Sequence, residues 1–234
     1  MSGNAVLWDF DGTLVNSALK NIAITKEILE LVVPHRSGEN LAHWLSNEED
    51  YHTANHQAAN WRELYIDYYG LTAEETDAAG KLWAQYQASN QTPVEVFDGV
   101  TDTVIALADI PQGICSQNSS QNIVAMLEET GVAQHFHSVI GYEQIPFEQS
   151  KPEPESGLKC LGHMFAELVE KTIIYVGDHE GDVIFTRNIA RRICSSNTLV
   201  SVAVAYSGGR PETWKNQPDH IIQHPEDLLK IVFG

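Results

Sequence analysis

Two aspartates stand two residues apart after a short apolar run near the start of the chain. The run covers residues 5–8; Asp9 follows it directly, with Asp11 and Gly12 close behind. Two carboxylates at the end of a strand can face one small space, and Gly12 permits a tight backbone turn beneath them. One carboxylate could attack an electrophile while the other moves a proton, or both could face a divalent cation. A solvated acidic turn has the same local pattern.

Two more aspartates follow a later apolar run. Residues 172–176 form this run, and Asp178 and Asp182 come after it, four residues apart. Residues spaced in this way on a helix lie on the same side. Carboxylate oxygens are ligands that suit Mg²⁺. The second pair therefore favours a reactive site over an acidic turn.

A hydroxyl and a cation complete the set of candidate groups. Ser116 follows the apolar run 112–115 and precedes a predicted helix, whose first backbone N–H groups can hold a phosphate. Lys151 precedes Pro152, which restricts the lysine backbone. The sequence thus supplies candidates for a nucleophile, a proton donor, anion-binding groups and metal ligands.

The elements that must position these residues alternate between short apolar runs and helical periodicity. This alternation predicts an α/β fold with a doubly wound, mostly parallel sheet. Ligands of open α/β sheets bind at the carboxyl ends of the strands, and the polar residues named above follow those ends. The predicted central strands are residues 5–8, 112–115, 172–176 and 200–205.

The second half of the chain continues the same alternation. Gly131 is expected at the carboxyl-terminal cap of one of its helices. Residues 191–199 are expected to form a surface connection. The remaining predicted elements are helices at residues 101–108, 119–130 and 225–232 and strands at residues 138–140 and 219–222.

The segment 17–95 differs in character from the rest of the chain and predicts a helical insert. It is rich in Ala, Leu, Glu, Gln, Trp and Tyr at helical spacing. We interpret its aromatic residues as buried helix faces rather than as a ligand platform. These residues are Trp61, Tyr65, Tyr68, Tyr69, Trp83 and Tyr86.

Composition limits the classes of function. The chain has 234 residues, 43% of them hydrophobic, and is long enough for one large domain with a smaller insert. Its formal net charge of −18 argues against nucleic acids and anionic membrane surfaces as partners, because both are polyanions. The longest apolar stretches fall well short of the roughly 20 residues of a membrane helix.

The cysteines and the first residues favour a cytoplasmic location. Cys115, Cys160 and Cys194 are an odd number, and none lies in a Cys-x-x-Cys motif. This usage is typical of a reducing compartment. Residues 1–10 carry no lysine or arginine, unlike the start of a secretory signal. Cys115 is interpreted as a buried strand residue rather than a reactive thiol.

Four segments resemble, in order and spacing, the four motifs of the haloacid dehalogenase superfamily of phosphohydrolases. LEETGVAQHFHSVIGYEQI and PDHIIQHPEDLL are similar to connecting segments of its phosphoglycolate phosphatase-like branch. The resemblance implies a Rossmann-like catalytic core, residues 1–16 and 96–234, and an inserted α-helical cap, residues 17–95, that chooses the leaving group. The motif segments are WDFDGTLVNS, GICSQNSS, SKPEPES and YVGDHEGDV.

The resemblance also implies a phosphatase that acts on a small phosphorylated metabolite through an aspartyl-phosphate. Asp9 would be the nucleophile, and Asp11 the general acid toward the leaving oxygen and then the base for water. Lys151 would neutralise the phosphoryl group and the Asp9 carboxylate. Mg²⁺ would be held by the Asp9 carboxylate, the Asp11 carbonyl and Asp178. Asp182 would orient a metal-bound water or Lys151.

The phosphate-binding segment departs from the family pattern. Ser116 and the backbone after it would hold the phosphoryl oxygens. Gln117 stands where many relatives have asparagine, and Asn118 comes one position later. Gln117 is therefore the predicted phosphate-binding residue by position, but whether Gln117 or Asn118 faces the phosphate stays open. The backbone contribution holds for either side chain.

Two other functions share these motifs. A phosphosugar mutase would pass the phosphoryl group to another substrate hydroxyl, and a noncatalytic phosphate-binding regulator would retain only the fold. Asp11 argues against a dehalogenase, which needs no acid toward an alcohol leaving group. The intact motif residues argue against the regulator. The identity of the substrate and the oligomeric state stay open at this point.

Histidine pairs are a separate candidate for a metal site. His52 and His56 are spaced i, i+4, and His135 and His137 stand two residues apart. Each pair lacks a third ligand at recognisable spacing, so solvated or packed histidine is the favoured interpretation. His179 lies between two of the acidic residues and is kept outside the predicted catalytic set.

Overall fold

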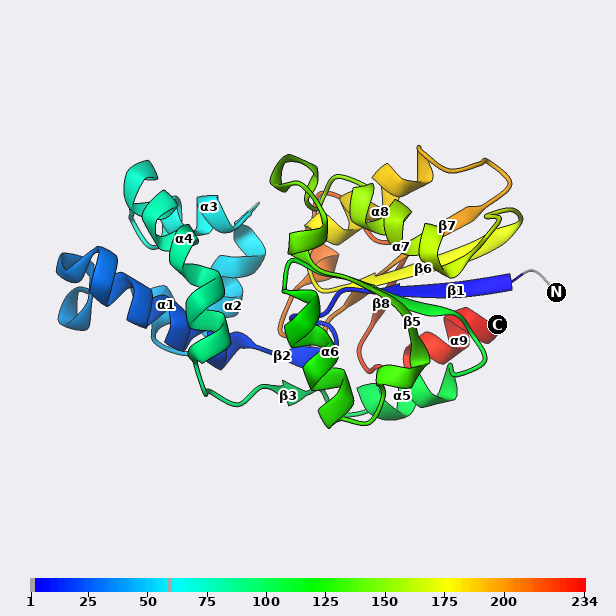
Figure 1. Ribbon diagram of the computed structural model, residues 1–234, viewed down its shortest axis with the longest axis horizontal. Helices are drawn as coiled ribbons and strands as arrows, with labels where there is room; N and C mark the ends of the chain where they lie inside the picture. Colours follow the sequence, from blue (N-terminus) through cyan, green and yellow to red (C-terminus); the bar gives the residue numbers. More distant parts are fainter. Residues whose placement is uncertain (1–2, 59) are drawn as a thin grey trace. The chain divides into compact units, whose positions relative to one another are not determined.

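The structure of the protein is a computed structural model that describes residues 3–58 and 60–234. The chain divides into two compact units. One unit comprises Met1–Val15 and Val96–Gly234, and the other comprises Asn16–Glu95. Figure 1 shows the elements of both units in sequence colours.

A six-stranded parallel sheet forms the centre of the first unit and confirms the predicted α/β class. Its strand order is β5-β4-β1-β6-β7-β8. From β1 the chain builds outward through β4 to β5, and then returns to the other side of β1 to place β6. The strand order therefore reverses between β1 and β6, the position at which open α/β sheets bind ligands. The strands are β1 Gly3–Trp8, β4 Gln112–Cys115, β5 Phe136–Ile140, β6 Lys171–Gly177, β7 Thr198–Val204 and β8 His220–Ile222.

Apolar runs form these strands because both faces of the sheet are covered by helices. In β1 the side chains from Ala5 to Trp8 are fully buried. Leu7 pairs with Gly113 of β4 on one side and with Tyr175 of β6 on the other. This register brings the carboxyl ends of the three strands to the same edge of the sheet.

The helices of this unit lie on opposite faces of the sheet. Figure 1 shows α7 (Glu155–Met164) and α8 (Glu180–Ala190) on one face. On the other face lie α5 (Val100–Ala106), α6 (Ser120–Glu129) and α9 (Asp227–Phe233). Right-handed crossovers that run in opposite directions from β1 produce this double winding.

Several element boundaries differ from the sequence predictions. The connection expected over residues 191–199 is too long, because Thr198 and Leu199 pair with strand β6. The strand predicted from residue 219 begins at His220, since the Asp219 side chain instead accepts hydrogen bonds from Ser201. Helix ends shift by one or two residues, as is usual where caps and fraying decide the boundary.

The second unit is built from helices α1 (Ala18–Val32), α2 (Glu48–Gln57), α3 (Trp61–Glu63) and α4 (Ala73–Ser89). Thr72 begins α4 with a reciprocal capping box to Glu75. The helices pack around an apolar cluster that includes Ile24, Ile28 and Leu45. Short 3₁₀ turns at Pro34–Arg36, Gly38–Asn40 and His43–Leu45 connect α1 to α2.

The aromatic residues of this unit form part of its core, which confirms the sequence interpretation. Tyr65 and Tyr69 are buried, and the other four residues pack against the same cluster. The segment is not a regular α-helix throughout, because Leu64–Tyr68 is a π-helix. The rings of Tyr65 and Tyr69 lie 5.2 Å apart between centroids.

Two short strands lie where the chain passes between the units. β2 (Val15–Asn16) pairs with β3 (Glu95–Val96) in a separate two-stranded sheet. Over residues 3–58 and 60–234, the structure contains no helix with the length and hydropathy needed to cross a membrane.

Candidate active site

The candidate site lies at the carboxyl edge of the sheet, where the strand order reverses. Asp9 follows β1 and donates its backbone N–H to the Val176 carbonyl of β6 at 2.8 Å. Asp178 follows β6 directly. Ser116 follows β4 and donates its backbone N–H to the Ile140 carbonyl of β5 at 3.0 Å. Strand pairing thus brings together residues that are far apart in the sequence.

Gly12 allows the turn after β1 to approach Asp178 closely. Its φ of +80° is rarely adopted by residues with a side chain. A Cβ atom at this position would lie 2.2 Å from Asp178 Oδ2. The prediction of a tight turn at Gly12 is therefore confirmed, and the reason is the carboxylate packed against the turn. The hydroxyl of Tyr206 also holds this turn, donating to the Thr13 carbonyl at 2.7 Å.

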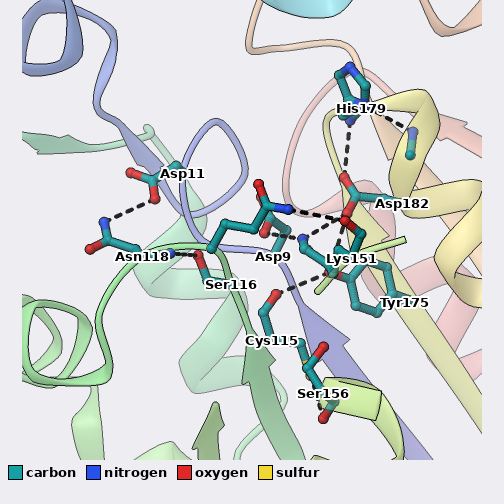
Figure 2. Close-up of polar contacts among 12 residues, drawn as sticks. Asp9, Asp11, Cys115, Ser116, Asn118, Lys151, Ser156, Tyr175, His179 and Asp182 are labelled. Atoms are coloured by element: carbon teal, nitrogen blue, oxygen red, sulfur yellow. Dashed lines mark hydrogen bonds and ion pairs between the residues drawn. The ribbon is translucent and has the colours of Figure 1, made fainter. Parts of the chain in front are cut away.

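The Lys151 ammonium forms hydrogen bonds to three buried side chains of the site (Figure 2). Its Nζ donates to Asp9 Oδ1 at 2.6 Å and to Asp182 Oδ1 at 2.9 Å. It also donates to the Tyr175 hydroxyl at 3.0 Å. The lysine side chain is only 11% exposed. A single ammonium in a buried position therefore links a carboxylate at the end of β1 to one in the first turn of α8.

Asp182 is fixed by donors on both of its carboxylate oxygens. Oδ1 accepts from Lys151, and the Tyr175 hydroxyl lies 3.3 Å from the same oxygen. Oδ2 accepts from the His179 backbone N–H at 3.1 Å, in the capping box that begins α8. A Cβ at Gly177 would lie 2.3 Å from Oδ2, so glycine there makes room for this carboxylate. These bonds suit Asp182 to holding Lys151 in place.

The carboxylates outnumber the cation in this cluster. Oxygens of Asp9, Asp178 and Asp182 lie within 4.8 Å of one another, and all three residues are buried. Burial raises the pKa of Asp9 to about 7, since it outweighs the lowering effect of Lys151, and the Asp182 charge adds to the increase. Burial, together with the Asp9 and Asp182 charges, raises the pKa of Asp178 well above its ordinary value. A divalent cation would offset this excess negative charge.

Lys151 stays charged in this setting. Burial lowers its pKa, but the carboxylates of Asp182 and Asp9 more than reverse that effect and raise the pKa well above the ordinary value. The site therefore presents one permanent positive charge beside the Asp9 carboxylate.

Asp11 belongs to a second group of contacts on the other side of Asp9. Its Oδ2 accepts from the Asn118 amide at 2.9 Å. Asn118 donates its backbone N–H to Ser116 Oγ at 3.1 Å, and Figure 2 shows Asp11 directed toward Asn118 rather than toward Lys151. Ser116 and Asn118 are both buried.

Gln117 and Asn118, between which the sequence left the choice open, have different contacts in the structure. Gln117 is exposed and donates its side-chain amide to the Lys151 carbonyl at 3.1 Å. Asn118 is the buried residue that contacts Asp11. A role for the Gln117 side chain in binding phosphate stays a prediction, and its observed contact is to the backbone of the lysine.

Two contacts were missed by the sequence reasoning. The first is the contact of the Tyr175 hydroxyl with Lys151. Tyr175 lies within an apolar strand, where a tyrosine indicates an aromatic residue of the core and not a hydroxyl that takes part in a site. The second is the contact of the Asn118 amide with Asp11. Asn118 comes one residue after the position at which many relatives have asparagine. Cys115 is buried as predicted, and burial raises the pKa of its thiol well above the ordinary value.

The histidine pairs do not form a metal centre with other described side chains. The rings of His52 and His56 lie 5.9 Å apart on α2. Within the part of the chain that the structure describes, the cluster of at least three possible metal ligands consists of Asp9, Asp178 and Asp182. His179 caps α8, where its Nδ1 accepts from the Gly181 N–H at 2.9 Å.

Comparison with known families gives a match over most of the chain. Residues 6–194 match the model of the haloacid dehalogenase-like hydrolase family. Phosphoglycolate phosphatase 1 of Pseudomonas aeruginosa is 26% identical over 227 residues, covering 96% of this chain and 78% of the relative. Pyrophosphatase PpaX of Listeria monocytogenes is 27% identical over 233 residues, covering 97% of this chain and 95% of the relative.

Solved structures share the fold. A haloacid dehalogenase-like family protein from Streptococcus pneumoniae superposes with a TM-score of 0.73 at 16% identity, covering 98% of both chains. A hydrolase of the same superfamily from Geobacter sulfurreducens has a TM-score of 0.62 at 18% identity, covering 99% of this chain and 97% of that chain.

Proposed function

Since the chain belongs to the haloacid dehalogenase-like hydrolase family, we propose that it is a Mg²⁺-dependent phosphatase that hydrolyses a small phosphorylated metabolite. The relatives named phosphoglycolate phosphatase and pyrophosphatase support this class of reaction. The observation that carries the proposal is the buried cluster of Asp9, Lys151, Asp178 and Asp182 at the switch point of the sheet.

Asp9 is the proposed nucleophile. A carboxylate oxygen of Asp9 forms a bond to phosphorus while the bond from phosphorus to the ester oxygen breaks, which leaves an aspartyl-phosphate. Attack requires an ionised carboxylate. The Lys151 ammonium at 2.6 Å favours this ionised form.

Asp11 is the proposed acid and base. It donates a proton to the leaving oxygen in the first step and accepts a proton from water in the second. Water then attacks phosphorus, the bond to the Asp9 oxygen breaks, and inorganic phosphate leaves. The Asn118 amide, at 2.9 Å from Asp11 Oδ2, supports the orientation of this carboxyl group.

Ser116 and Lys151 are the proposed phosphoryl-binding groups. The Ser116 hydroxyl and the backbone after it precede α6, a helix whose N-terminus attracts anions. Lys151 neutralises charge on the transferring group. Phosphoryl transfer depends mainly on positioning and charge neutralisation, and these residues supply both.

The acidic cluster fits a hard divalent cation. Its donors are carboxylate oxygens, the ligand type that Mg²⁺ prefers. Asp9, Asp178 and the Asp11 carbonyl are the proposed ligands, whereas both oxygens of Asp182 are held by donors of the chain. The cation would neutralise the phosphoryl oxygens and the carboxylates together. A phosphate dianion would otherwise approach a chain with a net charge of −18.

The proposal is tested by assaying the purified protein on phosphoglycolate, pyrophosphate and sugar monophosphates, with Mg²⁺ or with chelator. Release of inorganic phosphate that requires Mg²⁺ is expected for at least one compound. An isomerised sugar phosphate in place of released phosphate would indicate a mutase. Absence of any turnover in Mg²⁺, together with phosphate binding, would indicate a regulator and overturn the proposal.

A further inference from the structure

The hydroxyl of Tyr175 contacts Lys151 and two further polar groups of the site. It accepts from Lys151 Nζ at 3.0 Å, and it lies 3.2 Å from the Cys115 carbonyl and 3.3 Å from Asp182 Oδ1. The Tyr175 side chain is 1% exposed. Water therefore has little access to replace this hydroxyl as a partner of the lysine.

An ammonium group has three N–H bonds, and Lys151 has three acceptors for them. Two are the carboxylate oxygens of Asp9 and Asp182, and the third is the Tyr175 hydroxyl. Because the three acceptors come from different elements, they fix both the position of Nζ and the rotation of the ammonium. The hydroxyl keeps its own hydrogen for the Cys115 carbonyl or for Asp182.

The ring and the hydroxyl of Tyr175 have different contacts. The ring packs against Phe185 with centroids 5.0 Å apart, and Lys151 Nζ lies 5.6 Å from the Tyr175 ring centroid. Phenylalanine at this position would keep both ring contacts. The substitution Tyr175→Phe therefore removes the hydroxyl while it retains the shape of the core.

We propose that Tyr175 is a positioning residue that acts through Lys151, by holding the ammonium beside the Asp9 carboxylate. The inference rests on the proposed phosphatase function, because the lysine matters only where a phosphoryl group is transferred. A lysine that is already in place stabilises charge in the transition state without having to reorganise. Loss of the hydroxyl should accordingly lower kcat more than it changes KM.

The first experiment measures kcat and KM for wild type, Tyr175→Phe and the control Tyr69→Phe in Mg²⁺. Tyr69 is a buried tyrosine of the helical unit. We expect kcat of Tyr175→Phe to fall about tenfold, or about 1.4 kcal/mol, with KM changed by less than about twofold. Tyr69→Phe should match wild type. A kcat of Tyr175→Phe within about twofold of wild type would overturn the inference.

A second comparison asks whether the effect passes through the lysine. In a Lys151→Arg background the guanidinium replaces the ammonium that Tyr175 holds, so adding Tyr175→Phe should lower kcat by less than about twofold further. An equal loss in both backgrounds would indicate a general disturbance of the core and overturn the inference.

A third measurement does not depend on turnover or on the folding of any Tyr175 variant. In wild-type protein labelled with ¹⁵N-lysine, three acceptors should slow exchange of the Lys151 ammonium protons with water enough for an NMR signal. The Lys151→Arg spectrum identifies the signal by its loss. Ammonium protons that exchange as fast as those of exposed Lys230 would contradict the arrangement. Wild-type protein without phosphatase activity would instead refute the proposed function.

Discussion

The two units of the chain bury different kinds of polar group. Among the described residues, the buried acidic side chains are Asp9, Asp178 and Asp182, and all belong to the unit with the parallel sheet. The helical unit buries polar residues that carry no charge, such as Thr25 and Thr76, whose hydroxyls donate to carbonyls one turn earlier in their own helices.

This difference follows from what each unit is proposed to do. Burying a carboxylate is costly unless its charge is balanced, and one lysine for three carboxylates leaves the cluster with an excess of negative charge. Such an arrangement lowers the stability of the fold, and it fits a site that binds a cation and a phosphoryl group. Buried threonines bonded within their own helices carry no similar cost. Substitutions in the two units should therefore have opposite signatures in activity and stability.

The largest expected effect is the loss of activity on removal of the nucleophile. Asp9→Asn keeps the size of the side chain but cannot form the aspartyl-phosphate, so kcat should fall by about 10³-fold or more. Inorganic phosphate released under single-turnover and steady-state conditions measures this effect. The control is Asp227→Asn, a half-buried aspartate outside the site that pairs with Lys230 on α9, which should keep wild-type turnover. Undiminished phosphate release from Asp9→Asn would refute the nucleophile assignment.

A cavity in the helical unit should give the next largest effect, on stability rather than chemistry. Ile28 is fully buried in the apolar cluster of α1. Ile28→Ala should lower the free energy of unfolding by about 2–5 kcal/mol, and Ile28→Val by about 0.5–1.5 kcal/mol. Urea unfolding followed by tryptophan fluorescence measures both, because Trp44, Trp61 and Trp83 all lie in this unit. Equal stability of wild type and Ile28→Ala would contradict the described packing.

For the first unit, the sequence could predict where polar residues follow the strands better than it could predict their contacts. The spacing of Asp9, Asp11 and Asp178 after apolar runs indicated the strand ends, because parallel strands place their carboxyl ends at one edge. Which strands are neighbours depends on long-range pairing that periodicity does not encode. The contacts of Lys151 with Asp9 and Asp182 were expected only from the family resemblance. The Tyr175 hydroxyl could not be predicted for the same reason: a tyrosine in an apolar strand is typical of a core.

The helical unit shows the converse limit. The aromatic spacing correctly predicted that Tyr65 and Tyr69 lie in a core. It did not predict the π-helix at Leu64–Tyr68, since the same apolar pattern fits an α-helix and the choice depends on packing. Patterns of residue type thus report burial more directly than they report backbone geometry.

A smaller effect is expected on the pH dependence of stability in chelator. The pKa of Asp9 is raised from 3.8 to about 7, so between these values the folded protein holds a proton that the unfolded chain has lost. Stability should therefore decrease as pH rises through this window, by on the order of 1–3 kcal/mol for this group. The difference between wild type and Asp9→Asn reports the contribution of Asp9 together with its effect on Asp178. Groups outside the cluster, including His52 with its lowered pKa, titrate in both proteins and cancel.

The same series in Mg²⁺ tests the cause of this pH dependence. A cation that binds the folded carboxylates stabilises their ionised forms, so the difference between wild type and Asp9→Asn should reverse or flatten as pH rises. Thermal unfolding at about pH 4.5, 5.5, 6.5 and 7.5, with Mg²⁺ and with chelator, supplies the comparison, and the spacing of roughly one pH unit resolves the window. Wild type that gains stability over Asp9→Asn with rising pH in chelator would contradict the raised pKa.

The smallest expected effect comes from removing a buried hydroxyl in the helical unit. The Tyr69 hydroxyl is buried, and no hydrogen-bond partner for it occurs among residues 3–58 and 60–234. Because folding strips this group of water without replacing the bond, Tyr69→Phe should change stability by less than about 1 kcal/mol, in the stabilising direction. Tyr175→Phe should instead destabilise, since its hydroxyl bonds Lys151. Urea unfolding of the two variants side by side measures the contrast. If Tyr69→Phe loses more stability than Tyr175→Phe, the Tyr69 hydroxyl contributes more to folding than the Tyr175 hydroxyl does. That result would contradict the proposed difference between the polar groups of the two units.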